Sequence, residues 1–177
     1  MLQPKGVEML KSKNFILVVG ILLFLGGTPG WTMSPMMNPE NPLIGLKAPE
    51  FTLPDLNAKS SSFEEIRSGK NAILFFWATW CPHCRTQIKE IQSNQEQFLS
   101  QNTVMILIDT GEQKQQIVSY LKSAGVNLNV YLDQDGQVSD QYKIFGLPTF
   151  VFVNQQGIVT AVEHHLPKNF TEYFTSK

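Results

Sequence analysis

The chain has 177 residues, of which 42% are hydrophobic and 16% charged, and its formal net charge is -1. This length suits one domain with a modest extension, and the near-neutral charge gives no reason to expect nucleic acid as a partner. Two cysteines are too few for a disulfide-rich scaffold.

Residues 1–32 have the pattern of an export signal or a membrane anchor. Three lysines precede an apolar run from Phe15 to Gly27, and a basic flank before such a run is typical of both kinds of segment. The run is shorter than the ~20 residues that cross a bilayer, and no clear cleavage site follows it, so cleavage and anchoring both stay open. In either case we expect the rest of the chain to be translocated to the extracytoplasmic, or periplasmic, side.

Residues 33–42 are rich in proline and methionine and are predicted to be a linker. Residues 43–177 are predicted to be the folded domain, in which short apolar runs alternate with amphipathic stretches. Strands alternating with helices, followed by a terminal hairpin, predict a three-layer α/β sandwich with a mixed central sheet. The predicted strands are 73–77, 103–108, 129–132, 146–153 and 158–162, and the predicted helices are 61–66, 85–100, 112–124, 138–142 and 167–174.

The two cysteines, Cys81 and Cys84, lie where the first of these strands gives way to a helix. A structural disulfide between them would close a very small loop and restrict the unfolded chain little. A thiolate at Cys81 would face the helix N-terminus, so its pKa should be depressed, and Pro82 is tolerated early in a helix. His83, as a cation or as a donor, would lower that pKa further. Cys84 lies one turn further in, where it could resolve a mixed disulfide formed at Cys81.

Two other uses of the pair stay open. Zinc wants four ligands, and the chain offers only His83, His164 and His165 besides the cysteines. Copper(I) needs fewer ligands, so a copper shuttle is possible if His164 or His165 approaches the pair. A redox-inactive interaction domain is the second alternative to exchange. Thiol–disulfide exchange is favoured, with no bound metal and no cofactor other than the redox-active disulfide itself.

Three motifs in order resemble the thioredoxin superfamily, and within it the TlpA/ResA-like exported thiol–disulfide oxidoreductases. Phe76–Arg85 is similar to the active-site signature, Gly45–Asp55 to the N-terminal entry motif, and Gly146–Phe150 to the segment that holds a cis proline. The segment 103–124 is similar to the strand–helix insertion of the TlpA-like proteins. The resemblance covers about 44–174, nearly all of the predicted domain, and implies a thioredoxin-like fold with an N-terminal extension.

The resemblance implies a role for each matched residue. Cys81 would be the nucleophile and Cys84 the resolving thiol, with a Cys81–Cys84 disulfide in the oxidised form. The residues that would tune their reactivity are Pro82, His83, Trp80 and Gln87, and those that would contact a substrate are Trp77, Leu147 and Pro148. Implied partners are cysteine-containing exported proteins, including apocytochromes of cytochrome c maturation, and a membrane thiol–disulfide electron partner.

The chain also departs from the family pattern. Thioredoxin-like proteins often bury a carboxylate in the strand at the position that is Phe75 here, and many TlpA/ResA-like reductases carry Glu at the position of Gln87. A carboxylate at either position could accept the proton that the resolving thiol must lose. Gln87 cannot titrate, so Glu90 could serve as this proton acceptor instead. The dipeptide Pro82–His83 resembles that of the strongly oxidising DsbA-like proteins. The direction of electron flow, reductase or oxidant, therefore stays open.

Overall fold

The structure is a computed structural model that describes residues 41–175. The predicted anchor, residues 1–32, and residues 33–40 of the predicted linker lie outside the described residues. No helix within 41–175 combines the length and apolar character needed to cross a membrane.

The core of the domain is a five-stranded sheet in the order β5-β4-β3-β6-β7. Strands β3, β4 and β5 run parallel, and β6 and β7 complete the sheet as antiparallel neighbours. The predicted mixed sheet is confirmed. The strands are β3 (Asn71–Trp77), β4 (Thr103–Thr110), β5 (Val130–Asp133), β6 (Thr149–Val153) and β7 (Val159–Glu163).

Strand β3 lies at the centre because nearly every residue in it is apolar. Its side chains alternate between the two faces of the sheet, and from Ala72 to Trp77 all of them are buried. A strand covered on both faces is expected to be continuously hydrophobic rather than alternating. Phe75 stacks on Phe150 of β6 at 4.5 Å between ring centroids, which ties the two strands together in the core.

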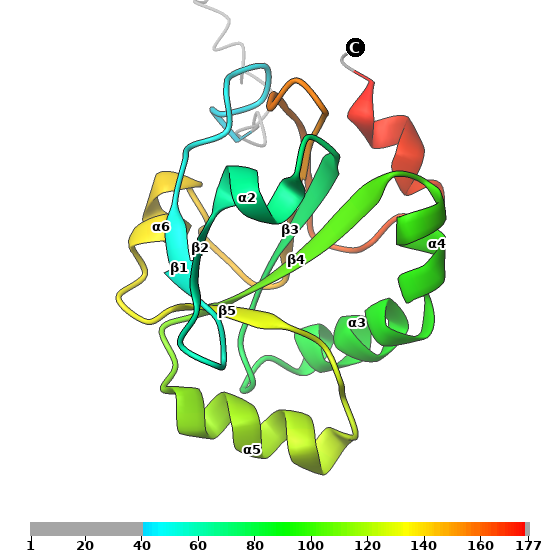
Figure 1. Cartoon of the computed structure of the whole chain (residues 1–177). Coiled ribbons are helices and arrows are strands. Elements are labelled where there is room, and N and C mark those ends of the chain that lie inside the picture. The colour runs from blue at the N-terminus through cyan, green and yellow to red at the C-terminus, as the bar shows by residue number, and fades with distance from the viewer. Residues whose placement is uncertain (1–40, 176–177) are drawn as a thin grey trace, which may run out of the picture. The chain divides into compact units, whose positions relative to one another are not determined.

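Helices cover both faces of the sheet, as Figure 1 shows. Helices α3, α4, α5 and the 3-10 helix η1 pack against the face that carries Ile73, Phe75 and Trp77. Helices α2 and α6, with strand β1, pack against the opposite face. The predicted three-layer architecture is therefore confirmed. The helices are α2 (Phe63–Arg67), α3 (Pro82–Ser93), α4 (Gln95–Ser100), α5 (Lys114–Ala124), α6 (Gln137–Gln141) and η1 (Phe170–Phe174).

One predicted helix was wrong, and another begins two residues later than predicted: the helix expected over 61–66 is α2, which starts at Phe63 with Ser62 as its N-cap. The single helix expected over 85–100 is two helices, because Asn94 leaves helical geometry (φ -113°, ψ 17°) and closes α3 with its side chain bonded to the Glu90 carbonyl. The segment Ser60–Ser62 forms strand β2, which pairs antiparallel with β1 (Thr52–Pro54). Three serines carry no strand pattern, and their pairing is made by backbone groups.

The sheet topology brings three distant segments to one edge. Because β3 and β4 are parallel, the residues that follow Trp77 and Asp109 leave the sheet at the same end. Strand β6 is antiparallel to β3 and pairs Thr149 with Phe76, so β6 begins where β3 ends. The cysteine pair, the loop after β4 and the Leu147–Pro148 segment therefore meet at this edge.

A buried carboxylate positions the chain that leads to Leu147–Pro148. Asp133, at the end of β5, has no exposed surface. It accepts hydrogen bonds from the backbone N–H groups of Val138 and Ser139 and from the Ser139 hydroxyl, at 3.1, 2.8 and 2.7 Å. These bonds hold the first turn of α6 against β5, and the loop after α6 leads into β6.

We predict that Asp133→Asn lowers the free energy of unfolding by about 1.5–3 kcal/mol, because an amide replaces a charged acceptor of three hydrogen bonds. Urea unfolding of the full chain measures this. Asp135→Asn is the matched control, since Asp135 is exposed two residues away, and its effect should stay within about 0.5 kcal/mol. Equal effects of the two substitutions would contradict the anchoring role.

Candidate active site

The cysteine pair lies at the N-terminus of α3, as the sequence predicts. A disulfide joins Cys81 and Cys84, whose Cα atoms are 5.3 Å apart. Cys81 is the N-cap residue of α3, Pro82 follows as its first residue, and the backbone N–H of Cys84 donates to Cys81 Sγ at 3.2 Å. Cys81 exposes 3% of its surface and Cys84 none. The sulfur of Cys81 is therefore the one that helix N–H groups stabilise as an anion.

The segment ahead of Cys81 is held by a carboxylate from the neighbouring strand's loop. Glu112 accepts hydrogen bonds from the Thr79 backbone N–H and from the Thr79 hydroxyl, the latter at 2.6 Å. Arg85 Nε donates to the carbonyl of the same Thr79, and its guanidinium lies 5.5 Å from the centre of the Tyr120 ring. Thr79 is thus fixed from both sides, two residues before the nucleophile.

Asp109 lies beside this arrangement and is almost completely buried, with 1% of its surface exposed. It pairs in register with Trp77 at the ends of β4 and β3. Burial, followed by the charge of nearby Glu112, raises the pKa of Asp109 to about 8 from an ordinary 3.8. Asp109 is therefore protonated at neutral pH.

The proline segment lies at the same edge of the sheet. The peptide bond between Leu147 and Pro148 is cis, so the conformation expected from the family resemblance is confirmed. Leu147 is half-buried and packs against the buried apolar side chains on both faces of the sheet. The exposed His164 has its Nδ1 atom 3.0 Å from the Pro148 carbonyl oxygen. His164 therefore contacts the proline segment.

The expected tuning and substrate residues divide between surface and core. Trp80 is 65% exposed, and Pro82 and His83 are exposed in the first turn of α3. Trp77, by contrast, has no exposed surface and packs against Tyr120 at 5.9 Å between ring centroids. The expectation that Trp77 contacts a substrate does not fit this position, because its side chain is enclosed by the core; it supports the loop from beneath.

The two positions that depart from the family pattern are both occupied by uncharged side chains in packed settings. Phe75 is fully buried in the core. Gln87 is half-buried on α3, where its Oε1 accepts from the Leu166 N–H at 2.9 Å and its Nε2 donates to Glu90 at 3.2 Å. Gln87 thus links the active-site helix to the segment after β7.

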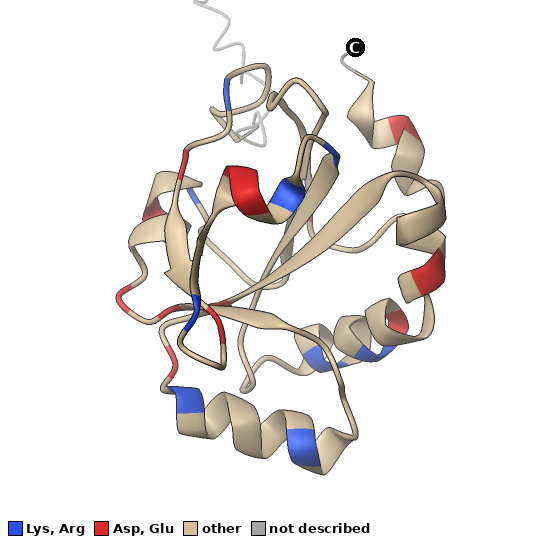
Figure 2. Cartoon of the chain, in the orientation of Figure 1, with Lys and Arg blue, Asp and Glu red and all other residues tan. Residues whose placement is uncertain are grey.

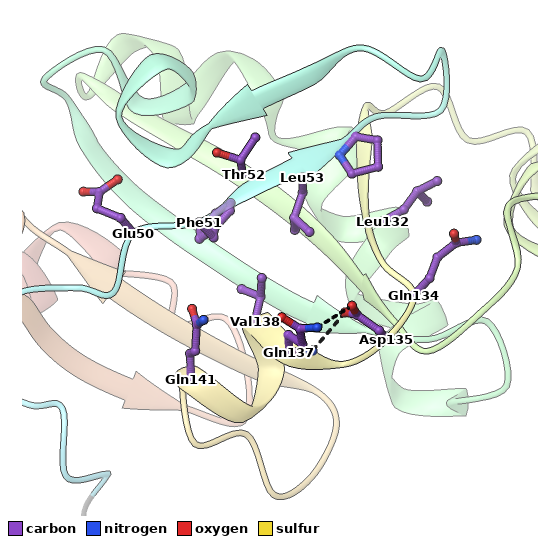
Figure 3. A pocket seen from close by; sticks show the side chains of 11 residues that line it. Glu50, Phe51, Thr52, Leu53, Leu132, Gln134, Asp135, Gln137, Val138 and Gln141 are labelled. Atoms are coloured by element: carbon purple, nitrogen blue, oxygen red, sulfur yellow. Dashed lines mark hydrogen bonds between the residues drawn. The ribbon is translucent and has the colours of Figure 1, made fainter.

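Neither a metal-ligand cluster nor the pocket beside β1 adds to this site. Within residues 41–175, no group of three or more His, Cys, Asp or Glu side chains is placed to hold a metal ion. A pocket of about 600 Å³ lies between β1 and the segment from β5 to α6, on the opposite face of the sheet (Figure 3). Its walls contain neither cysteine nor the proline segment; they are Glu50, Phe51, Thr52, Leu53, Pro54, Leu132, Gln134, Asp135, Gln137, Val138 and Gln141.

Sequence reasoning assigned no role to Asp109, Glu112 or Tyr120. The available signal was an acid at the end of a buried apolar strand, next to a strand that leads into the cysteine pair. Carboxyl ends of parallel strands lie together at one edge of a sheet, which is where such folds place their sites. The sequence does not show that β3 and β4 are neighbours, so it could not place Asp109 and Glu112 at the active site.

The fold and this site define a thioredoxin-like protein that carries a dithiol–disulfide pair at a helix N-terminus. Comparison with known proteins agrees, since the model of the AhpC/TSA family matches residues 44–162. The chain belongs to this family. It is a thiol–disulfide oxidoreductase of the ResA-like kind, as its relatives show.

The thiol–disulfide oxidoreductase ResA of Bacillus subtilis is 34% identical over 156 residues, which cover 87% of each chain. Among solved structures, the thioredoxin domain of a thiol–disulfide oxidoreductase from Bacteroides vulgatus superposes with a TM-score of 0.64 at 22% identity, covering 73% of this chain and 94% of that one. StoA of Bacillus subtilis superposes with a TM-score of 0.60 at 22% identity, covering 72% and 98%. The two structures agree in fold, and ResA agrees in both family and chemistry.

We predict that Asp109→Asn removes a pH dependence of stability. Because the pKa of Asp109 is higher in the folded state, the folded chain binds this proton more tightly than the unfolded chain between about pH 4 and 8. The contribution of Asp109 to stability is therefore largest below pH 4 and falls as pH rises towards 8. Asp109→Asn, which buries no charge, should flatten this decline and exceed the parent in unfolding free energy at pH 9.

Urea unfolding at several pH values measures this, with the exposed Asp140→Asn as control. An identical pH dependence in Asp109→Asn and the parent would contradict the assignment of a buried proton to Asp109.

Proposed function

We propose that this chain exchanges disulfides with exported proteins on the extracytoplasmic side, through Cys81 as nucleophile and Cys84 as resolving thiol. The proposal rests on one observation: the two sulfur atoms differ in hydrogen bonding and in burial. Cys81 Sγ accepts an N–H bond at the start of α3, whereas Cys84 is fully enclosed one turn further in. Cys81 is therefore the residue that attacks the substrate disulfide. Cys84 attacks only afterwards, at the Cys81 sulfur of the mixed disulfide.

In the reducing direction, the Cys81 thiolate attacks a substrate disulfide, forms a mixed disulfide and releases one substrate thiolate. The Cys84 thiol loses its proton to a solvent base and attacks Cys81 Sγ. The Cys81–Cys84 disulfide forms, and the second substrate thiolate leaves and takes up a proton. Two electrons pass from the dithiol to the substrate. A membrane thiol–disulfide partner would return them.

Three observations support a protein substrate at this edge. Trp80 offers an exposed aromatic surface next to Cys81, and aromatic side chains contribute large apolar contact area at interfaces. Leu147 and Pro148 lie at the same edge of the sheet as the pair, and a proline has no N–H that could compete for the thiolate. Figure 2 shows acidic and basic residues on several elements of the described domain. We expect recognition to rest on shape and apolar contact.

The extracytoplasmic location rests on the basic and apolar pattern of residues 5–27. In that compartment the ResA-like direction would be reduction, including the reduction of apocytochromes before haem attachment. The Pro82–His83 dipeptide favours the opposite direction, in which the protein donates its disulfide.

We predict that Cys84→Ser traps mixed disulfides, because the substrate cannot be released once it is bound to Cys81. Non-reducing electrophoresis of cells that express the full chain should show adducts that disappear on reduction. Cys81→Ser is the matched control and should trap none, because Cys84 is buried. Failure of Cys84→Ser to capture any partner would contradict the exchange function.

We predict that the reduction potential of the full chain separates the two directions. Equilibration with glutathione should give a value near or below that of thioredoxin, about -270 mV, for a reductase. A value near that of DsbA, about -120 mV, would overturn the reductase assignment and leave the oxidant.

A further inference from the structure

Asp109 presents an unusual combination of burial and missing partners. Among the described residues, four buried side-chain polar atoms have no hydrogen-bond partner: both carboxyl oxygens of Asp109, Trp77 Nε1 and the Tyr120 hydroxyl oxygen. Buried polar groups are almost always paired, so a carboxyl group left in this state needs an explanation. Trp77 and Asp109 pair in register at the ends of β3 and β4, and Tyr120 packs against Trp77.

Glu112 is the acidic neighbour of Asp109 and lies within reach of its side chain. Glu112 is 5% exposed and already accepts two hydrogen bonds from Thr79. Two neighbouring buried carboxylates repel each other unless one carries a proton. Because both bonds from Thr79 need Glu112 as an acceptor, the proton is placed on Asp109, whose carboxyl group is the one without a hydrogen-bond partner.

We propose that Asp109 holds a proton beside the Glu112 carboxylate and that the two residues act as positioning residues for Cys81. The protonated pair keeps Glu112 bound to Thr79, and loss of the proton places two negative charges side by side, loosens Thr79 and slows exchange at Cys81. The proton passes from Asp109 to a solvent base, and no electrons move. This inference rests on the proposed exchange function and adds a pH-sensitive control to it.

The other charged and titratable groups around the pair fit this arrangement. Asp133 on the adjacent β5 adds negative charge, which further favours the protonated form. On the helical side, Tyr120 of α5 packs on Trp77, and Arg85 of α3 lies over the Tyr120 ring while it bonds to Thr79. Burial and the two acidic neighbours place the pKa of Asp109 at about 8, so Asp109 titrates just above neutral pH.

The first test measures the proton directly. Carbon-13 NMR of the carboxyl groups of the full chain should show one side-chain carboxyl titrating near pH 8, and Asp109→Asn should remove that signal. Glu112→Gln should move the Asp109 titration to lower pH, because it removes the neighbouring negative charge. Asp135→Asn, on an exposed turn, should leave it in place. Absence of any carboxyl titrating above pH 6 in the parent would overturn the proposal.

The second test measures exchange at Cys81. The reduced full chain is mixed with 5,5′-dithiobis(2-nitrobenzoate), and the release of thionitrobenzoate is followed from pH 6 to 10. An amide at position 109 mimics the protonated acid, so Asp109→Asn should react at the parent's rate at pH 7. At pH 9 it should react about two- to tenfold faster than the parent, which is the factor expected for one weakened hydrogen bond. Equal rates of Asp109→Asn and the parent at both pH values would overturn the proposal.

Two substitutions at Thr79 test the hydrogen bond between Thr79 and Glu112. Thr79→Val removes the hydroxyl bond to Glu112 and should slow exchange about two- to tenfold at pH 7, whereas Thr79→Ser should restore it. Equal rates in the two variants would overturn the contact's role. The proposed function has its own test: it fails if Cys84→Ser traps no partner, and the NMR titration of Asp109 can be measured whatever that result is. If exchange occurs but its pH dependence is the same in Asp109→Asn and the parent, only the further inference is refuted.

Discussion

The parallel pairing of β3 with β4 is the constraint on which the site depends. Because the two strands run in the same direction, the chain leaves both at one edge. The cysteine pair follows β3, while Asp109 lies at the end of β4 and Glu112 follows it. Antiparallel β6 enters the sheet from the same edge and brings Pro148 with it. One arrangement of three strands therefore assembles the nucleophile, its support and the proline segment from residues up to about seventy positions apart.

The helix N-terminus gives this edge its chemistry. An N–H group of α3 points at Cys81 Sγ, while the same helix buries Cys84 against the sheet. Thiol–disulfide exchange needs one sulfur that attacks and one that waits, and the first turn of a helix separates the two by exposure and by electrostatic environment. The rest of the domain keeps that turn in place through Thr79, which is bonded to Glu112 on one side and to Arg85 on the other.

The sequence allowed much of this to be predicted. The continuously apolar β3, the cysteine spacing, Pro82 and the Leu147–Pro148 motif led to the fold, the family and the cis peptide bond, because each depends on residues close together in the chain. Predictions that depended on distant contacts did less well. Ser60–Ser62 became a strand because β1 supplies its backbone partners, and Trp77, expected at the substrate surface, is enclosed by helices that follow it.

The sequence by itself determined the reacting atoms: two thiols three positions apart, at a strand-to-helix junction, with a proline and a histidine between them. It also showed that the usual positions for a buried acid hold Phe75 and Gln87. Only the tertiary structure decided that an acid is nevertheless buried nearby, since Asp109 and Glu112 reach the active-site segment through strand order rather than through sequence spacing. A pKa depends on burial and on neighbouring charge, and both are set by the folded arrangement of strands and helices.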